Sequence, residues 1–223
     1  NERTHIRYEA LVEATTAADP VTPDAQQRPV EQLPSDVLLF TMPSRLCESD
    51  LLSNTAWRLF GDVPSGWTRA QAVMDWVHGA LEFTPGSSNS MTTASQVYLQ
   101  RTGVCRDFTQ LGVAFLRALN IPARYCFGYL PDIGVAPVDE PMDFAAWLEA
   151  YLDDAWYTFD PRNNSPRTGR VLIGRGRDAV DVAMVTSYGR LPLLGLRVCA
   201  EDASDEPWAS ARRPVYDEVQ HWS

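Results

Sequence analysis

The sequence predicts an α+β fold, because helical patterns fill the first half of the chain and strand patterns fill the second half. Apolar residues recur at helical spacing in several segments between residues 51 and 120, and alternating, aromatic-rich segments follow from residue 124. Helices first and strands afterwards favour a largely antiparallel sheet over the parallel sheet of an α/β protein. At 223 residues the chain is long enough for one domain with a full core.

The first part of the chain is predicted to lie outside the core. Alternation from Ile6 to Val12 predicts a strand, and the following stretch up to Pro34, rich in Thr, Pro, Asp and Gln, predicts a surface connection. We therefore expect an N-terminal strand and extension at 1–34, a core at 35–200 and an acidic C-terminal tail at 201–223.

Four segments of the core carry helical signals. A helix is predicted through residues 51–60, and residues 68–71 have the spacing of a capping box that opens a second helix over 70–81. A shorter helix is expected at 92–100. The fourth helix begins at Cys105 and ends near Asn120, since the proline at 122 cannot continue it.

The second half of the core predicts a sheet of short strands. Period-two alternation with aromatic residues is clear in three segments and weaker in two. The clear strands are expected at 124–130, 145–152 and 155–159, and the weaker ones at 182–188 and 194–199.

Charge and composition exclude several classes of partner. The net charge is −10, and all 19 basic residues are arginine. Nucleic acids and anionic membranes are bound through clustered basic residues, so neither is an expected partner. No apolar run approaches the roughly 20 residues that a membrane-spanning helix needs.

The cysteines argue against a metal site. Cys47, Cys105, Cys126 and Cys199 are widely spaced, and only three histidines are present, so we expect no zinc, no other metal and no organic cofactor. Free cysteines favour a reduced, cytoplasmic setting. The chain begins at Asn1 with no signal-like stretch behind it, which we interpret as a removed leader or a trimmed chain.

Cys105 is the candidate nucleophile. The turn at Gly103 and Val104 leads directly into the helix that begins at Cys105, and a helix N-terminus stabilises a thiolate. We expect Gly103 to supply unusual backbone angles in this turn. A small buried thiol with a packing role is the alternative interpretation of Cys105.

A predicted hairpin brings a carboxylate toward position 145. If Asp153 and Asp154 form a two-residue turn, Trp147 lies opposite Asp160 and residue 145 lies diagonal to it on the same face. A histidine at 145 would then be oriented by Asp160, as in a catalytic triad. The alternative is that Asp160 only caps the turn before Pro161.

Three ordered blocks of the chain resemble bacterial transglutaminase-like proteins. Residues 103–108, with 121–125 and 128–129, are similar to the nucleophile segment of that family. Residues 143–147 and 156–160 are similar to its histidine and aspartate segments. The resemblance covers about residues 34–189 and implies a papain-like α+β core with the nucleophile helix packed on an antiparallel sheet. It also implies a Cys-His-Asp triad that performs acyl transfer through a thioester.

One position departs from that pattern and removes the general base. The family has Asp-Phe-His-Ala-Trp where this chain has Asp143-Phe144-Ala145-Ala146-Trp147. Because only one triad position is changed, we favour a deliberate His-to-Ala substitution over a naturally altered member. Gln110 also stands where the resemblance implies histidine. His5, His78 and His221 are interpreted as surface or partly packed residues rather than as replacement bases.

The sequence thus predicts a cysteine-dependent acyltransferase or hydrolase of an amide or ester. Cys105 would attack the carbonyl, Asp160 would position a base at residue 145, and Trp147 would contact substrate. With Ala145, activity is expected to be lost or strongly impaired, and the pKa of Cys105 is expected near the ordinary value of about 8.5.

Other interpretations stay open. A pseudoenzyme that binds a peptide or protein in the old cleft is the first alternative, and a thiol redox sensor with a low pKa is the second. Four charged residues beyond the triad are interpreted either as partners of carboxylates or substrate or as a solvated loop: Arg170, Arg175, Arg177 and Asp178.

Overall fold

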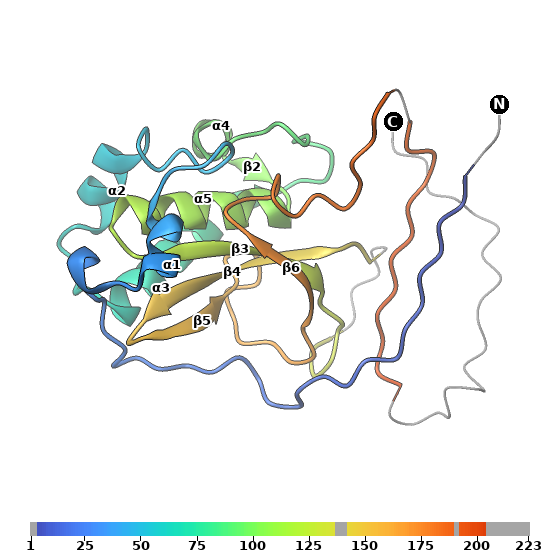
Figure 1. Cartoon of the computed structure of the whole chain (residues 1–223), viewed down its shortest axis with the longest axis horizontal. Coiled ribbons are helices and arrows are strands. Elements are labelled where there is room, and N and C mark those ends of the chain that lie inside the picture. Colours follow the sequence, from blue (N-terminus) through green and yellow to red (C-terminus); the bar gives the residue numbers. More distant parts are fainter. Residues whose placement is uncertain (1–3, 137–141, 190–191, 204–223) are drawn as a thin grey trace.

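The fold is a four-stranded antiparallel sheet with helices packed on one face (Figure 1). A computed structural model describes residues 4–136, 142–189 and 192–203. In chain order the elements are η1 (Val30–Gln32), α1 (Ser35–Leu38), η2 (Leu39–Thr41), α2 (Ser53–Phe60), α3 (Trp67–Ala80), β1 (Glu82–Phe83), α4 (Ala94–Gln100), β2 (Thr102–Gly103), α5 (Cys105–Ala118), β3 (Ala123–Tyr129), β4 (Ala145–Leu152), β5 (Ala155–Phe159) and β6 (Val171–Gly176). This arrangement confirms the predicted α+β class.

Helix α5 is the centre of the core. Every residue from Asp107 to Ala118 in this helix is buried, because the sheet covers one side of it and α2, α3 and α4 cover the other. Trp76 stacks on Tyr98 at 5.8 Å between ring centroids, and both rings pack edge-on against Phe115. The helix that carries Cys105 is therefore fixed on both sides.

The sheet has the strand order β5-β4-β3-β6, and all its pairs are antiparallel. Strands β3, β4 and β5 match the three clear sequence predictions closely. The fourth strand, β6 at residues 171–176, was not predicted: two glycines, Gly174 and Gly176, and an arginine weaken its alternation. The solvated-loop interpretation of this stretch is wrong.

Three other predictions of local structure are wrong. Residues 182–188 and 194–199 have no strand in the part of the chain that the structure describes. Residues 6–12 are extended but pair with no described strand, and Ile6 and Tyr8 are 87% and 80% exposed. Alternation creates a strand only where a partner edge is present, and here none of the described residues supplies one.

The capping box predicted at 68–71 does not form. Helix α3 begins at Trp67 after Gly66, whose φ is 91°, and no side chain caps it. The N–H of Trp67 donates instead to the carbonyl of Ala25 at 2.9 Å. A capping box does form one helix later, where Thr93 and Gln96 exchange hydrogen bonds at the start of α4.

The N-terminal extension crosses the molecule below the sheet (Figure 1). Gln26 and Asp153 bond each other reciprocally, at 2.9 and 3.0 Å, so the extension is tied to the turn between β4 and β5. Asp19 contacts the loop that precedes β6. Its backbone N–H donates to the carbonyl oxygen of Arg167, and its carboxylate accepts from the backbone N–H of Arg167 and from the guanidinium of Arg170. The extension is thus part of the packed structure from Asp19 onward.

Candidate active site

The β4–β5 hairpin has the predicted register. Asp153 and Asp154 form the two-residue turn, with φ angles of 43° and 62°, and Leu152 pairs with Ala155. Two successive positive φ angles are typical of the type I′ turn, which matches the twist of a hairpin. Because Leu148 pairs with Phe159, the next residues along the two strands, Trp147 and Asp160, lie opposite each other.

Cys105 lies against the start of β4, where Ala145 stands. Its Sγ is 3.5 Å from the carbonyl oxygen of Phe144, and the backbone N–H groups of Ala146 and Arg106 point to the sulfur. The thiol therefore contacts the residues on both sides of Ala145. The helix N-terminus and the edge of β4 together hold the sulfur at the position that the sequence predicts.

Asp107 fixes the turn that leads into Cys105. Its carboxylate is fully buried and accepts from the N–H of Val104 at 2.8 Å and from the hydroxyl of Ser88. Arg106 bonds the same Ser88 and the carbonyl of Asn89, so the loop before α4 is fastened beside the nucleophile. The sequence signal for this role is an acidic residue, Asp107, in the first turn of the helix.

Gly103 is needed for space and not for unusual backbone angles. It does not have a positive φ, so the expectation from the sequence is wrong on this point. A Cβ at this position would lie 2.6 Å from the Cβ of Asp107. The turn therefore needs glycine because the Asp107 side chain passes directly beside it.

Burial raises the pKa of Cys105 to about 11. The carboxylates of Asp143 and Asp160 raise the pKa further, and the N–H groups of Ala146 and Arg106 lower it. The expectation of a pKa near 8.5 is therefore wrong, because desolvation of the thiolate outweighs the helix N-terminus. The raised pKa also argues against a redox sensor with a low thiol pKa.

Asp160 is buried and its carboxylate is saturated with hydrogen bonds. Oδ1 accepts from the N–H groups of Arg162 and Asn163 at 3.1 and 3.0 Å. Oδ2 accepts from the Asn163 amide at 2.8 Å and from the Arg170 guanidinium at 2.9 Å. Four donors fill the lone-pair positions of an ionised carboxylate. Asp160 caps its turn, as the alternative interpretation holds, and its charge also acts on the candidate nucleophile Cys105.

Trp147 is 2% exposed, and the Arg170 guanidinium lies over its ring at 4.9 Å. Its expected contact with substrate stays a prediction, and its burial favours a packing role. The arginines after Asp160 do pair with carboxylates: Arg170 with Asp160 and Asp19, Arg175 with Glu149, and Arg177 with Asp181. Asp178 is buried and accepts from the N–H of Leu46.

Neither of the described histidines, His5 and His78, hydrogen-bonds Cys105. His78 lies on α3, and its Nδ1 is 3.1 Å from the carbonyl of Arg162, just beyond Asp160. His5 is exposed in the extension, and His221 lies outside the described residues. Gln110 is fully buried, its amide nitrogen reaches the carbonyl of Thr92 at 3.4 Å, and its Oε1 has no hydrogen-bond partner.

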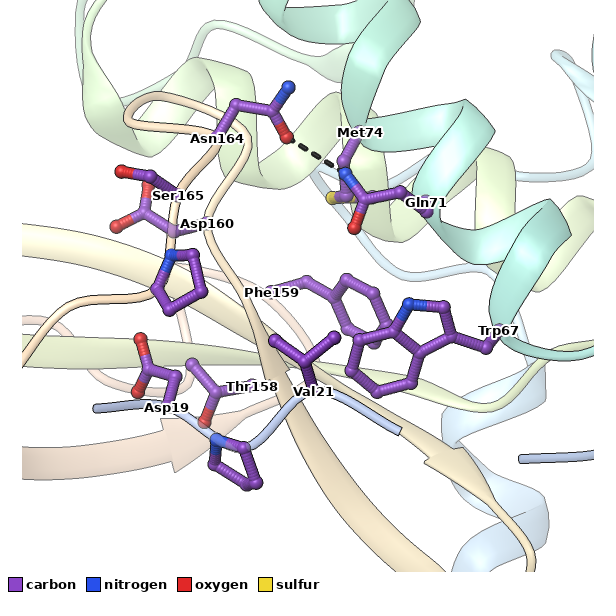
Figure 2. Close-up of a pocket in the computed structure, with 12 residues that line it drawn as sticks. Asp19, Val21, Trp67, Gln71, Met74, Thr158, Phe159, Asp160, Asn164 and Ser165 are labelled. Atoms are coloured by element: carbon purple, nitrogen blue, oxygen red, sulfur yellow. Dashed lines mark hydrogen bonds between the residues drawn. The ribbon is translucent and has the colours of Figure 1, made fainter. Parts of the chain in front are cut away.

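A cavity of about 360 Å³ opens beside Asp160 (Figure 2). Trp67 and Phe159 form its apolar side, Val21 of the N-terminal extension closes another side, and Gln71 bonds Asn164 across its rim at 3.0 Å. Cys105 does not line this cavity. Among the described residues we find no group of three or more side chains suited to a metal, and no helix long and apolar enough to cross a membrane.

Residues 55–161 match the model of the transglutaminase-like superfamily, and this segment contains Cys105, Ala145 and Asp160. Residues 55–161 therefore form a transglutaminase-like domain. A candidate cysteine protease from Cytophaga hutchinsonii has a solved structure that is 40% identical, with a TM-score of 0.69 over 74% of this chain and 55% of that one. The resemblance seen in the sequence and the papain-like α+β core are thereby confirmed.

Curated relatives of this transglutaminase-like core include uncharacterized mycobacterial proteins. One from Mycobacterium leprae is 33% identical over 115 residues, which are 50% of this chain and 41% of the relative. One from Mycobacterium tuberculosis is 33% identical over 115 residues, which are 48% of this chain and 37% of the relative. The matched segment thus spans less than half the length of these relatives.

Proposed function

We propose that this transglutaminase-like core performs cysteine-dependent acyl transfer or hydrolysis on an amide or ester of a peptide or protein. The observation that carries the proposal is the position of the Cys105 thiol, at the N-terminus of α5 and against the residues that flank position 145. Asp160 lies at the end of the neighbouring strand. A cysteine, a base position and an acid in this order fit the logic of a triad. The related protein described as a candidate cysteine protease supports the reaction class.

The residues divide the reaction between them. Cys105 forms the bond to the carbonyl carbon, the amine or alcohol leaves, and water or an acceptor amine releases the acyl group from the thioester. The backbone N–H of Cys105 would donate to the oxyanion. Asp160 would orient a base at position 145, and this step is missing because the methyl group of Ala145 cannot carry a proton.

The chain with Ala145 is proposed to be inactive or strongly impaired. With a pKa of about 11, only a small share of Cys105 is thiolate at neutral pH, and no base accepts its proton. Loss of a triad member typically costs several orders of magnitude in rate. We propose the division that the sequence predicts, with an extension at 1–34, a core at 35–200 and a tail at 201–223. We also propose a reduced, cytoplasmic setting, without nucleic acid, membrane or cofactor.

A peptide-binding or protein-binding pseudoenzyme is the second candidate. The observation that favours it is the saturated carboxylate of Asp160, which is fully occupied by donors of its own loop and of Arg170. If the Asp160 carboxylate only stabilises its own turn and the ion pair with Arg170, its role does not require a histidine at position 145. In this case the cleft would bind a segment without acylation of Cys105.

Acylation of the thiol by an activated ester separates the two candidates. Incubation with p-nitrophenyl acetate is expected to leave a slowly formed acetyl adduct on Cys105, and the adduct should accumulate because its hydrolysis also needs the base. Mass spectrometry of peptides locates it. The adduct should disappear in Cys105→Ala and persist in Cys199→Ala, the control for a surface thiol. Acetylation at Cys199 without any at Cys105 would contradict the proposal.

A further inference from the structure

Arg170 connects the candidate acid to the N-terminal extension. Its Nε donates to both carboxylate oxygens of Asp19, at 3.1 and 2.9 Å, and its Nη2 donates to Oδ2 of Asp160 at 2.9 Å. The two carboxylates belong to segments far apart in the sequence, since Asp19 precedes Arg170 by 151 positions and Asp160 precedes it by 10. One guanidinium thus bridges two carboxylates, which a planar fork of donors does well.

The geometry leaves Arg170 little freedom. Its guanidinium lies over the ring of Trp147, the residue opposite Asp160, with 4.9 Å to the ring centroid. Its side chain is only 9% exposed, and its backbone directly precedes β6, which pairs with β3. Two ion pairs and one ring contact therefore hold the Arg170 side chain in this conformation. A shift of Arg170 would remove one of the four donors to the Asp160 carboxylate, and the only charged one among them.

The ion pair between Arg170 and Asp160 also affects the electrostatics of the site. The side chain of Asp160 is 2% exposed, so water does little to screen its charge. The groups that face it are the N–H groups of its own turn, the amide of Asn163 and the guanidinium of Arg170, and Cys105 is within electrostatic reach. Arg170 is the only full positive charge that the described structure bonds to this carboxylate.

We infer that Arg170, held by Asp19, is a positioning residue that fixes the Asp160 carboxylate and sets how strongly it acts on a base at position 145. The inference rests on the proposed function, because that function gives Asp160 a base to orient. The effect of Arg170 on the charge of Asp160 can be measured without any turnover. A guanidinium that shares Oδ2 weakens the pull of the carboxylate on a neighbouring imidazolium. The N-terminal extension, through Asp19, in turn competes with Asp160 for the guanidinium.

The test uses the imidazole that Ala145→His introduces, titrated by NMR in the full chain. Its signals are distinguished from those of His5, His78 and His221 by comparison with the parent. Arg170→Met is expected to raise the pKa of the introduced imidazole by about one unit, because Asp160 then keeps its full charge beside it. Asp19→Asn is expected to lower this pKa, because the guanidinium is left to Asp160 alone.

Two further variants separate positioning from general structure. Arg170→Lys keeps the charge, so the imidazole pKa should stay closer to its Ala145→His value than it does in Arg170→Met. Arg175→Met removes another arginine, which pairs with the buried Glu149, and should leave the imidazole pKa unchanged. If Arg170→Met does not fold, Arg170→Lys and Asp19→Asn still decide the question.

The inference is overturned if the imidazole pKa does not respond to Arg170 or Asp19, or if Arg175→Met moves it equally. The result is independent of turnover. A responsive pKa without ester turnover in Ala145→His would support the inference and contradict the proposed function. Ester turnover in Ala145→His with an imidazole pKa that does not respond would support the proposed function and contradict the inference.

Discussion

At the scale of single residues, the site depends on side chains that hold the nucleophile and the acid. Cys105 and Asp160 could be named from the sequence because a helix start and a hairpin register place them. Asp107 had a usable signal, an acid in the first turn of a helix. Asp19 had none, since nothing in the sequence connects it with Arg170 across 151 positions. The raised pKa of Cys105 also depends on burial that only the fold determines.

Asp107→Ala is expected to destabilise the fold by about 1–3 kcal/mol, because it leaves the N–H of Val104 and the hydroxyl of Ser88 without their buried acceptor. It should also release the turn before Cys105. Urea unfolding measures the first effect and hydrogen exchange at Val104 and Cys105 the second. Asp62→Ala, at an exposed position, is the matched control. Equal stability of the two variants would show that the carboxylate does not hold this turn.

At the scale of elements, the patterns that carry their own local signal were predicted well. Helix α5, strand β4, strand β5 and the turn between them follow from apolar periodicity and turn residues. Predictions failed where a distant segment decides the outcome. The first N–H of α3 donates to the carbonyl of Ala25, which is far away in the sequence. Residues 6–12 lack a described partner strand. Strand β6 forms despite its glycines because β3 pairs with it.

Gly103→Ala is expected to destabilise the junction of β2 and α5 by about 1–3 kcal/mol. The added methyl group would lie 2.6 Å from the Cβ of Asp107, and Asp107 cannot move without losing its bonds to Val104 and Ser88. Thermal unfolding measures the cost. Gly79→Ala is the control, because a Cβ there meets no atom within 4 Å. A Gly103→Ala variant as stable as Gly79→Ala would rule out the steric role of Gly103.

At the scale of the whole molecule, the fold buries the thiols of Cys47 and Cys126 and half-buries that of Cys105, so that all three are held protonated. Burial raises the pKa of Cys47 to about 12 and of Cys105 to about 11, and it raises the pKa of Cys126 well above its usual value. In the unfolded chain these thiols ionise near pH 8.5. Above that pH the unfolded state loses protons that the folded state keeps, so stability is full below about pH 8.5 and declines as the pH rises toward the folded pKa values.

The free energy of unfolding is therefore expected to fall between pH 8.5 and 10, by up to about 1.4 kcal/mol per pH unit for each buried thiol. Urea unfolding at pH 7, 8.5, 9 and 10 gives the slope. Cys47→Ala should reduce the slope by the share of one thiol, whereas Cys199→Ala, at an exposed position, should change it less. Stability that is constant up to pH 10 would contradict the burial of these thiols.

The central claim is that Cys105 is the nucleophile of a triad whose base position is occupied by Ala145. The most direct measurement is burst release of p-nitrophenol from an ester by Ala145→His and by the parent, with alkylation of Cys105 by iodoacetamide followed from pH 6 to pH 10. The account predicts a burst only in Ala145→His, abolished by adding Cys105→Ala. It also predicts an alkylation midpoint inside this pH range for Ala145→His, whereas the alkylation rate of the parent, with a thiol pKa of about 11, should still be rising at pH 10. No burst and an unchanged midpoint in a folded Ala145→His chain would contradict the triad and favour the binding module.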